Sequence, residues 1–343
     1  MSGKKILVTG GTGYIGSHTV VELFNAGYEP IIVDNFSNSS PKILDQIEAI
    51  IGVRPELVEV DLCDEKLTAD IVNRYPDISG VIHFAAYKAV GESVEQPLKY
   101  YHNNFFSLIN LLSAFRDKPV NFVFSSSCTV YGEPDKLPVT EEAPVKKAES
   151  PYGNTKQIAE EILSEVAAVS PTLKVTALRY FNPVGAHHSA LIGELPTGVP
   201  QNLVPFITQS AIGKRGPLTV HGNDYNTPDG SCIRDYIHVV DLAKAHVAAL
   251  KHMENSAADR GYDVFNIGTG KGSTVLEVIN AFENAAGVKL DYQIGGRRSG
   301  DIEKIFGDVS KAEAELGWKA ELGLDEMMSS AWAWEKYIQQ NPL

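Results

Sequence analysis

The residues with the clearest chemistry are a tyrosine and a lysine one helical turn apart. Tyr152 and Lys156 lie in the segment SPYGNTK, and a helix is expected to start near Pro151 and run to about residue 169. Residues four apart on a helix share a face. A free tyrosine titrates near ~10, so the adjacent ammonium favours the phenolate and lowers the pKa of the tyrosine toward working pH. Because a lone Tyr-x-x-x-Lys also arises by chance on solvated helix faces, the pair needs support from other motifs.

A serine at the end of a predicted strand supplies part of that support. The apolar run over 121–124 continues into Ser125, Ser126 and Ser127, and Ser127 is placed where it can hydrogen-bond a reacting oxygen. Its neighbour Cys128 is interpreted as a small packing residue rather than a nucleophile. We therefore predict Ser127, Tyr152 and Lys156 as the catalytic residues.

The element that must face these residues is a glycine-rich loop near the N-terminus. The apolar run Ile6-Leu7-Val8 leads into Gly10, Gly13 and Gly16, and an amphipathic segment follows. This order predicts a buried strand, a tight turn and a helix whose N-terminus faces a phosphate group. A structural turn without a ligand is the alternative.

A second strand supports a dinucleotide at this loop. The run over 30–33 ends in Asp34, 18 residues after Gly16, where a carboxylate binds the adenosine ribose hydroxyls. The next basic residue is Lys42, so a 2′-phosphate has no evident partner. NAD is therefore predicted rather than NADP, and its positive nicotinamide would further favour a Tyr152 phenolate.

Strand-like runs alternate with helical patterns through the first 182 residues, which predicts an α/β fold with a doubly wound, Rossmann-type parallel sheet. Further strands are expected over 57–60, 80–84 and 174–180, and one long helix over 94–115. Asp61 is interpreted equally as a residue near the adenine or as a helix N-cap. The loop over 85–91 follows a strand and lies where open α/β sheets bind ligands.

Beyond residue 182 the alternation becomes irregular. Long polar loops occupy 183–201 and 222–231, and loops of this length within a compact chain usually carry function. We predict a cofactor domain over 1–182, with returning elements near 235–268. A smaller, interleaved α/β substrate lobe is predicted over 183–343.

Composition restricts the partners and the compartment. The 43 acidic and 30 basic residues give a net charge of −13, which argues against nucleic acid and anionic membranes but not against a small anionic substrate. The three cysteines lie far apart and lack metal-ligand spacing. With neither a signal-like segment nor an 18-residue apolar run, a cytoplasmic location is expected.

These elements together resemble the extended short-chain dehydrogenase/reductase family, and four further segments closely resemble its UDP-galactose 4-epimerases. They are FAAYKAVGES at 84–93, YYHNN at 100–104, RYFNPVGA at 179–186 and RDYIHV at 234–239. The resemblance covers nearly the whole chain. It implies reversible interconversion of UDP-galactose and UDP-glucose with bound NAD, and a homodimer that pairs the helices near 94–115 and 151–169.

The motifs and the resemblance together give three sets of expected site residues. The cofactor set is Gly10, Gly13, Tyr14, Ile15, Gly16, Asp34, Asn35, Phe36, Ser37, Asn38, Ser39, Asp61, Leu62, Phe84, Ala85, Ala86, Lys88, Asn103, Ser127, Tyr152, Lys156 and Phe181. The UDP-sugar set is Lys88, Ser127, Tyr152, Asn182, Asn202, Leu203, Thr219, Val220, His221, Arg234, Arg298 and Asp301. The catalytic set is Ser127, Tyr152 and Lys156.

Some of these residues keep a second interpretation. Arg234 and Arg298 carry guanidinium groups suited to a diphosphate, but surface ion pairs are the alternative. The segment after His221 either shapes a uridine pocket or forms a plain turn. His187 and His188 suggest a metal, but no third ligand follows at a suitable spacing, so no metal is predicted.

The resemblance implies a mechanism. As a hypothesis, the Tyr152 phenolate, assisted by Ser127, removes the proton of the sugar 4-hydroxyl while the C4 hydride passes to NAD. The transient 4-keto hexose turns over on its UDP anchor, and the hydride returns to the opposite face.

Three rival functions remain. Nucleotide-sugar 4,6-dehydratases of the family typically carry an Asp-Glu pair directly after the strand-end Ser or Thr, whereas Cys128 and Thr129 stand here. Another NAD-dependent nucleotide-sugar dehydrogenase would release reduced cofactor with its product. A non-catalytic NAD-binding regulator would be expected to lack Tyr152 or Lys156.

One residue bears on substrate range. At Ile305 the family carries either a bulky tyrosine or a small residue, and by resemblance this position limits room at the sugar 2-position. Isoleucine is intermediate in size, so acceptance of N-acetylated substrates stays open.

Overall fold

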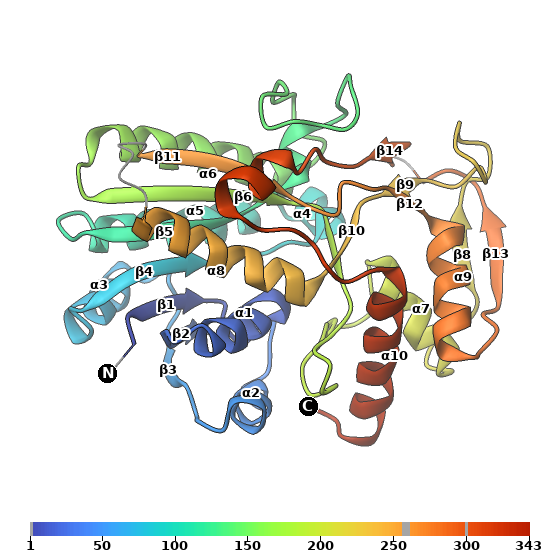
Figure 1. The fold of residues 1–343 in the computed structure, drawn as a ribbon, viewed down its shortest axis with the longest axis horizontal. Helices are drawn as coiled ribbons and strands as arrows, with labels where there is room; N and C mark the ends of the chain where they lie inside the picture. The colour runs from blue at the N-terminus through green and yellow to red at the C-terminus, as the bar shows by residue number, and fades with distance from the viewer. Residues whose placement is uncertain (1–2, 256–260, 299–300) are drawn as a thin grey trace.

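A parallel sheet organises the larger part of the protein, for which the computed structural model describes residues 3–255, 261–298 and 301–343. Within these ranges seven strands lie in the order β11-β6-β5-β4-β1-β2-β3, and every neighbouring pair is parallel (Figure 1). The strands are β1 (Lys5–Thr9), β2 (Glu29–Asp34), β3 (Glu56–Glu59), β4 (Ile78–His83), β5 (Val120–Ser127), β6 (Leu173–Tyr180) and β11 (Tyr262–Ile267). The α/β, Rossmann-type prediction is confirmed.

Apolar side chains on both faces of the strands explain why the sheet is covered on both sides. In β1, Ile6 and Val8 join one buried cluster and Leu7 joins another, because successive side chains point to opposite faces. The first cluster packs against α1 (Tyr14–Asn25), α2 (Ile43–Ile51) and α8 (Val239–Asn255). The second packs against α3 (Glu65–Arg74), α5 (Pro97–Ala114) and α6 (Pro151–Val169).

The strand order reverses between β1 and β4. β1 pairs with β2 on one side and with β4 on the other, so connections from these strands leave in opposite directions. The loops after β1 and β4 therefore border one crevice at the carboxyl ends of the strands, which is where open α/β sheets bind ligands.

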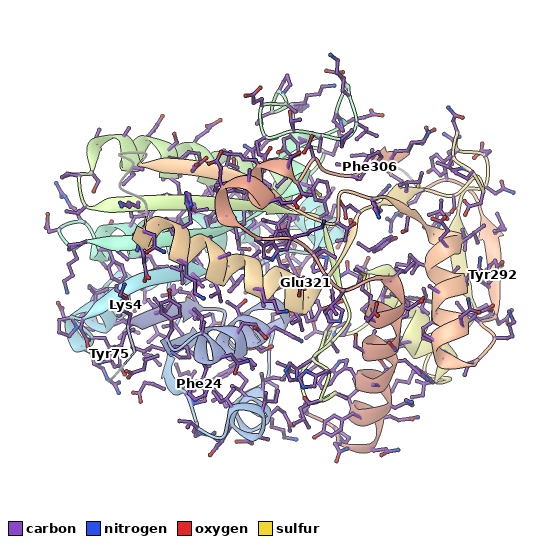
Figure 2. All side chains as sticks on the ribbon, viewed as in Figure 1. Lys4, Phe24, Tyr75, Tyr292, Phe306 and Glu321 are labelled. Carbon is purple, nitrogen blue, oxygen red and sulfur yellow. The ribbon has the colours of Figure 1, made fainter. Side chains whose placement is uncertain are left out.

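The remaining elements gather beside the sheet, on the right of Figure 1. They include α7 (Leu203–Ala211), α9 (Val275–Ala286), α10 (Leu324–Gln340), β8 (Leu218–His221) and β13 (Tyr292–Gly295). Their buried apolar side chains form a third cluster. In Figure 2 Tyr292 of β13 lies at the outer edge of this group. The domain boundary at 182 and 183 stays a prediction.

Short elements connect the two parts. β7 (Asn182–Val184) pairs with β10 (Tyr236–His238), and β9 (Ile233–Arg234) lies between β12 (Ser273–Thr274) and β14 (Lys304–Ile305). A 3₁₀ turn, η1 (Cys128–Tyr131), follows β5, and a π-helical turn, η2 (Ala312–Leu316), precedes α10. None of the helices in the described ranges is long and apolar enough to cross a membrane.

The helix predicted over 94–115 is confirmed over 97–114, but it does not extend unbroken to residue 94. The structure has α4 (Val90–Glu95) and α5 (Pro97–Ala114), with Gln96 between them at φ −130° and ψ 60°. A residue that precedes proline is sterically kept out of the helical region, and Pro97 then fits the first turn of the new helix.

Candidate active site

The glycine loop is packed too closely to carry side chains. A Cβ on Gly16 would lie 2.1 Å from the carbonyl oxygen of Gly10, and one on Gly10, at φ +68°, would lie 3.0 Å from the Ala85 nitrogen. The loop therefore touches both its own helix and the end of β4. Helix α1 starts at Tyr14, and Gly13 at its N-cap supplies no side-chain cap, which leaves first-turn N–H groups for an anion.

Asp34 ties the glycine loop to the loop after β2. Its Oδ2 accepts a hydrogen bond from the Thr12 amide at 3.1 Å. Its Oδ1 accepts from the Phe36 amide at 2.9 Å and from Ser39 Oγ at 3.1 Å. The side chain is almost buried, so the carboxylate is held in one place at the carboxyl end of β2. This arrangement fits recognition of ribose hydroxyls.

Asp61 is not a helix N-cap, so one of its two interpretations is wrong. Helix α3 begins four residues later, at Glu65, and Asp64 caps it by accepting from the Leu67 amide at 2.9 Å. Asp61 instead accepts from the Cys63 amide at 2.9 Å in the turn after β3. Cys63 Sγ in turn lies 3.7 Å from the carbonyl oxygen of Asn103 on α5. The structure thus brings two predicted cofactor residues, Asp61 and Asn103, to one edge of the crevice.

The three predicted catalytic side chains meet at the carboxyl end of β5. Ser127 ends that strand, and Tyr152 and Lys156 project from the first turns of α6, whose N-cap Ser150 accepts from the Gly153 amide at 3.1 Å. The Lys156 ammonium donates to the carbonyl oxygen of Ser125 at 2.6 Å and lies 6.0 Å from the centre of the Tyr152 ring. Both side chains of the Tyr-Lys pair are buried.

The protein's own groups raise the pKa of Tyr152, contrary to the expectation from the lysine alone. Burial penalises the phenolate and shifts the pKa of Tyr152 well above its usual value, while a hydrogen bond with Ser127 opposes the rise. Burial also lowers the pKa of Lys156 to about 8, opposed by the nearby Glu160 carboxylate. The ammonium is aimed at a carbonyl oxygen, so it compensates little of the burial of the phenol.

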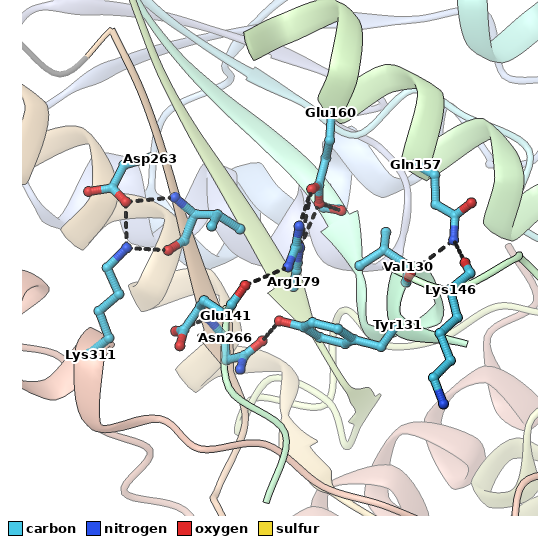
Figure 3. A network of polar contacts seen from close by, with 12 residues as sticks. Val130, Tyr131, Glu141, Lys146, Gln157, Glu160, Arg179, Asp263, Asn266 and Lys311 are labelled. Atoms are coloured by element: carbon cyan, nitrogen blue, oxygen red, sulfur yellow. Dashed lines mark hydrogen bonds and ion pairs between the residues drawn. The ribbon is translucent and has the colours of Figure 1, made fainter. Parts of the chain in front are cut away.

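A buried ion pair fixes α6 against the sheet (Figure 3). Arg179 of β6 donates through Nε to Glu160 Oε1 at 3.0 Å and through Nη2 to Oε2 at 2.5 Å, and both side chains are buried. Ser126 also donates to Glu160, and the Arg179 guanidinium lies 4.8 Å from the Tyr131 ring centre. Glu160 lies one helical turn after Lys156. The ion pair therefore sets where the turn that carries Tyr152 and Lys156 lies along the sheet.

A second positioning residue was missed by the sequence analysis. The buried Asn104 accepts from the Tyr87 amide at 2.9 Å and donates to the Tyr87 carbonyl at 3.1 Å. It also donates to Thr155 Oγ1 at 3.1 Å, beside the catalytic lysine. Asn104 therefore joins the loop after β4 to α6. A polar residue within the apolar pattern of α5 was the available signal.

Two predicted substrate arginines share one carboxylate. Arg298 donates to Asp301 through Nη2 at 2.8 Å, and Arg234 Nη2 lies 3.7 Å from the same Oδ1. The Arg234 side chain is 18 % exposed and that of Arg298 57 %, so they differ in burial. Arg234 lies on β9 and Arg298 in the loop after β13, so both guanidinium groups reach one carboxylate, and their role in binding a diphosphate stays a prediction.

The other predicted substrate residues lie on different elements of the smaller part. Asn182 starts β7 beside Asp235, while Asn202 and Leu203 start α7. Thr219, Val220 and His221 lie on β8, where the side chain of Val220 is buried in the third apolar cluster. Each role in binding UDP stays a prediction.

The residues after Ser127 form an apolar wall. Cys128, Phe181 and Ile305 belong to one buried cluster, and burial raises the pKa of the Cys128 thiol to about 12. A thiol held neutral in this way is a poor nucleophile, which agrees with the interpretation of Cys128 as a packing residue. Ile305 therefore lies beside the catalytic strand end, where its size can limit a substrate.

The paired histidines belong to the loop after β7. Burial lowers the pKa of His187 to about 4, and its Nδ1 lies 2.8 Å from Ser189 Oγ. In the described part of the chain, the group with metal-type ligands within 4.8 Å of one another is His252, Asp263 and Glu315, on other elements. The prediction that the site uses no metal stays a prediction.

Comparisons with known proteins agree with this geometry. A family model described as GDP-mannose 4,6 dehydratase matches residues 7–331. A UDP-glucose 4-epimerase of Haemophilus influenzae is 50% identical over 332 residues, covering 96% of this chain and 97% of the relative. The chain belongs to the UDP-glucose 4-epimerase family. The enzyme of that name from Homo sapiens is 46% identical over 99% of this chain and 97% of its own.

Solved structures of the family match the fold closely. The UDP-glucose 4-epimerase of Stenotrophomonas maltophila, with bound NAD and formylated UDP-arabinopyranose, has a TM-score of 0.95 at 46% identity. It is matched over 98% of this chain and 99% of its own. The Bifidobacterium longum enzyme, in complex with NAD⁺ and UDP, has a TM-score of 0.92 at 48% identity, with the same coverage.

Proposed function

We propose that this chain is an isomerase that interconverts UDP-galactose and UDP-glucose at C4 of the hexose, within galactose metabolism, with NAD as resident cofactor. The observation that carries the proposal is the convergence of Ser127, Tyr152 and Lys156 at the carboxyl end of β5, on the same edge of the sheet as the glycine loop that follows β1, two strands away. Membership of the UDP-glucose 4-epimerase family supports it, as do the family structures that hold NAD.

The residues present fit a dinucleotide. The space that a Cβ would fill at Gly10 and Gly16 is already taken by neighbouring backbone, so only glycine allows the loop its close course. The N-terminus of α1 would hold the pyrophosphate, and Asp34 the adenosine ribose. Bound NAD supplies a reversible hydride acceptor for the sugar C4, so the reaction has no net redox change.

Tyr152 would exchange the proton of the sugar 4-hydroxyl. Burial keeps the phenol protonated in the protein alone, so a positive charge brought close to it promotes its ionisation. Lys156, with a pKa of about 8, is mostly charged near neutral pH and contributes to this. Ser127, which hydrogen-bonds Tyr152, would orient the reacting oxygen.

Arg234 and Arg298 would hold the nucleotide while the hexose turns over. Arg234 and Arg298 can exchange part of their contact with Asp301 for diphosphate oxygens, because guanidinium groups bind such oxygens with two donors. A fixed UDP anchor and a free hexose allow either face of the 4-keto sugar to be presented, which is what inversion requires.

The decisive experiment is to incubate the purified protein with UDP-galactose alone and to look for UDP-glucose by nuclear magnetic resonance. Conversion without added NAD is expected. Conversion only after NAD is added would mean that the cofactor dissociates, and the function would stand. Accumulation of reduced cofactor with an oxidised sugar would replace the epimerase with a dehydrogenase, and loss of water from the hexose would indicate a 4,6-dehydratase.

A homodimer through α5 and α6 is part of the proposal. Leu98 and Phe106, two helical turns apart on α5, are 81% and 49% exposed, and Ile109 lies one turn further on. An exposed apolar stripe of this kind fits a helix-to-helix contact with a second copy. Analytical ultracentrifugation is expected to find a dimer. The Phe106→Glu substitution is expected to shift the protein toward the monomer.

We also propose a cytoplasmic location. Cys63, Cys128 and Cys232 are free thiols, as is typical of proteins kept in a reducing compartment. Fractionation of cells that express the tagged protein tests this, and recovery with a membrane fraction would contradict it.

A further inference from the structure

The Glu194 carboxylate lies between residues predicted to bind the cofactor and residues predicted to bind the UDP-sugar. Glu194 Oε1 accepts a hydrogen bond from Asn202 Nδ2 at 2.7 Å and lies 3.6 Å from the Lys88 ammonium. Lys88 belongs to the loop after β4, and Asn202 directly precedes α7, so a single oxygen joins the cofactor side to the substrate side. The Glu194 side chain is 11% exposed, against 47% for Lys88, which makes the glutamate the fixed member of the group.

The backbone around Glu194 is held from two sides. Its carbonyl oxygen accepts from Trp334 Nε1 of α10 at 2.8 Å. A Cβ on the preceding Gly193 would lie 2.4 Å from the Trp334 ring, so glycine lets the chain reach this position. Gly193 also forms a β-bridge with Ala186, which closes the loop after β7. Glu194 is thus anchored before any ligand arrives.

Asn202 uses its side chain in an unusual way. Asparagine is favoured at the N-cap of a helix because its side chain accepts from the first-turn amides. Asn202 is the N-cap of α7 but makes no such bond, and its amide donates to Glu194 instead. The amides of Leu203 and Val204 and the second hydrogen of the Asn202 side-chain amide remain as donors at the start of α7, where Pro205 has no N–H.

We propose that Glu194 is a positioning residue that holds Lys88 and Asn202 at a fixed separation and so aligns the UDP-sugar with the cofactor side. An ammonium has three donors and an amide two, so each partner can keep Glu194 and still bind a ligand. The inference rests on the proposed function, in which Lys88 and Asn202 contact ligands. It assigns Glu194 no contact with the reacting atoms.

The test is a set of steady-state measurements with UDP-galactose. Glu194→Ala is expected to raise KM about 3- to 10-fold, the equivalent of one lost hydrogen bond, with a smaller change in kcat. Glu194→Gln keeps an oxygen for Asn202 without the charge, so it is expected to recover part of the KM. An unchanged KM in Glu194→Ala would overturn the proposal.

A double-mutant comparison separates positioning from a general structural effect. If Glu194 acts through Asn202, Glu194→Ala raises KM much less in an Asn202→Ala background. An equal rise in both backgrounds contradicts the proposal. Glu335→Gln is the matched control, because Glu335 lines one small cavity together with Glu194 but its carboxylate contacts Lys214 and Thr208. It is expected to lower the melting temperature without changing KM.

A binding measurement keeps this test separate from the proposed function. Calorimetric titration with UDP alone needs no turnover, and Glu194→Ala is expected to weaken UDP binding by a similar factor. If the wild-type protein binds UDP but does not epimerise, the proposed function fails while the role of Glu194 is still decided. Unaltered UDP affinity in the variant rejects the role of Glu194.

Discussion

The cofactor half and the substrate half of this site are built in different ways. In the cofactor half, the glycine loop, Asp34 and the Tyr152–Lys156 pair each belong to a short motif within one strand-to-helix unit. In the substrate half, Arg234 meets Asp301, and Glu194 meets Lys88, from elements far apart in the chain. The first half is positioned by local geometry, and the second by packing.

This difference predicts which property of the protein a substitution changes. A local motif is fixed by hydrogen bonds within a turn or helix, so a conservative change there should alter chemistry while the fold remains. A group assembled by packing depends on several elements, so a change there should alter affinity and stability together. The four predictions below test this contrast, from the largest expected effect at neutral pH to the smallest.

Tyr152→Phe should have the largest effect, because it removes the group that exchanges the proton. We expect kcat to fall by about 10²- to 10⁴-fold, the range of general acid–base catalysis, with UDP binding unchanged. Turnover and calorimetric titration with UDP measure the two quantities. Tyr180→Phe, which removes another buried hydroxyl near Ser125, is the matched control and should keep most of the activity. Near-normal turnover in Tyr152→Phe would remove the tyrosine from the mechanism.

Arg179→Met tests whether the catalytic turn depends on packing after all. Removing one partner of a buried ion pair leaves the Glu160 charge uncompensated, which typically costs about 3–5 kcal/mol of unfolding free energy. Chemical denaturation measures the loss. The double variant Arg179→Met with Glu160→Leu removes both charges and should recover much of the stability. A single variant as stable as wild type would show that the pair is not needed.

Arg234→Gln and Arg298→Gln compare two cations of the substrate half. Losing a charge-assisted hydrogen bond to the better buried Arg234 should weaken UDP binding by about tenfold or more, equivalent to about 1.5–3 kcal/mol. Arg298 is more exposed, and a screened contact contributes about 0.2–1 kcal/mol. Arg298→Gln should therefore weaken UDP binding only a few-fold. Calorimetry with UDP ranks the two variants. The reverse order would mean that burial in the protein alone does not predict the stronger contact.

His18 should have little effect near neutral pH, and its contribution appears only in acid. Burial beneath the glycine loop lowers the pKa of His18 from 6.5 to about 3. Below pH 6.5 the unfolded chain therefore binds a proton that the folded chain does not, and stability falls as pH falls. Between about pH 7 and pH 5, His18 should account for roughly 2 kcal/mol of that loss. Denaturation of wild type and His18→Asn at the two pH values measures the difference, and parallel losses would contradict it.

The sequence alone determined the fold class and the local motifs. Hydrophobic runs of strand length between helical patterns defined the parallel sheet, and the spacing of Gly10, Gly13, Gly16 and Asp34 defined the dinucleotide loop. These features depend on neighbours a few residues away, so a linear pattern contains them. The break at Pro97 was also within reach, because the constraint of proline on Gln96 is local, but the apolar stripe of the longer helix obscured it.

Only the tertiary structure decided how the site is held and charged. Nothing in the sequence pairs Glu160 with Arg179, joins Asn104 to Thr155, or places Glu194 between Lys88 and Asn202, because these partners come from elements whose distance depends on packing. In the protein alone, burial raises the pKa of Tyr152, and spacing along a helix shows the nearby ammonium but not this burial. Residue types and local spacing indicated which groups of this protein react, whereas packing decided their positions and their pKa values.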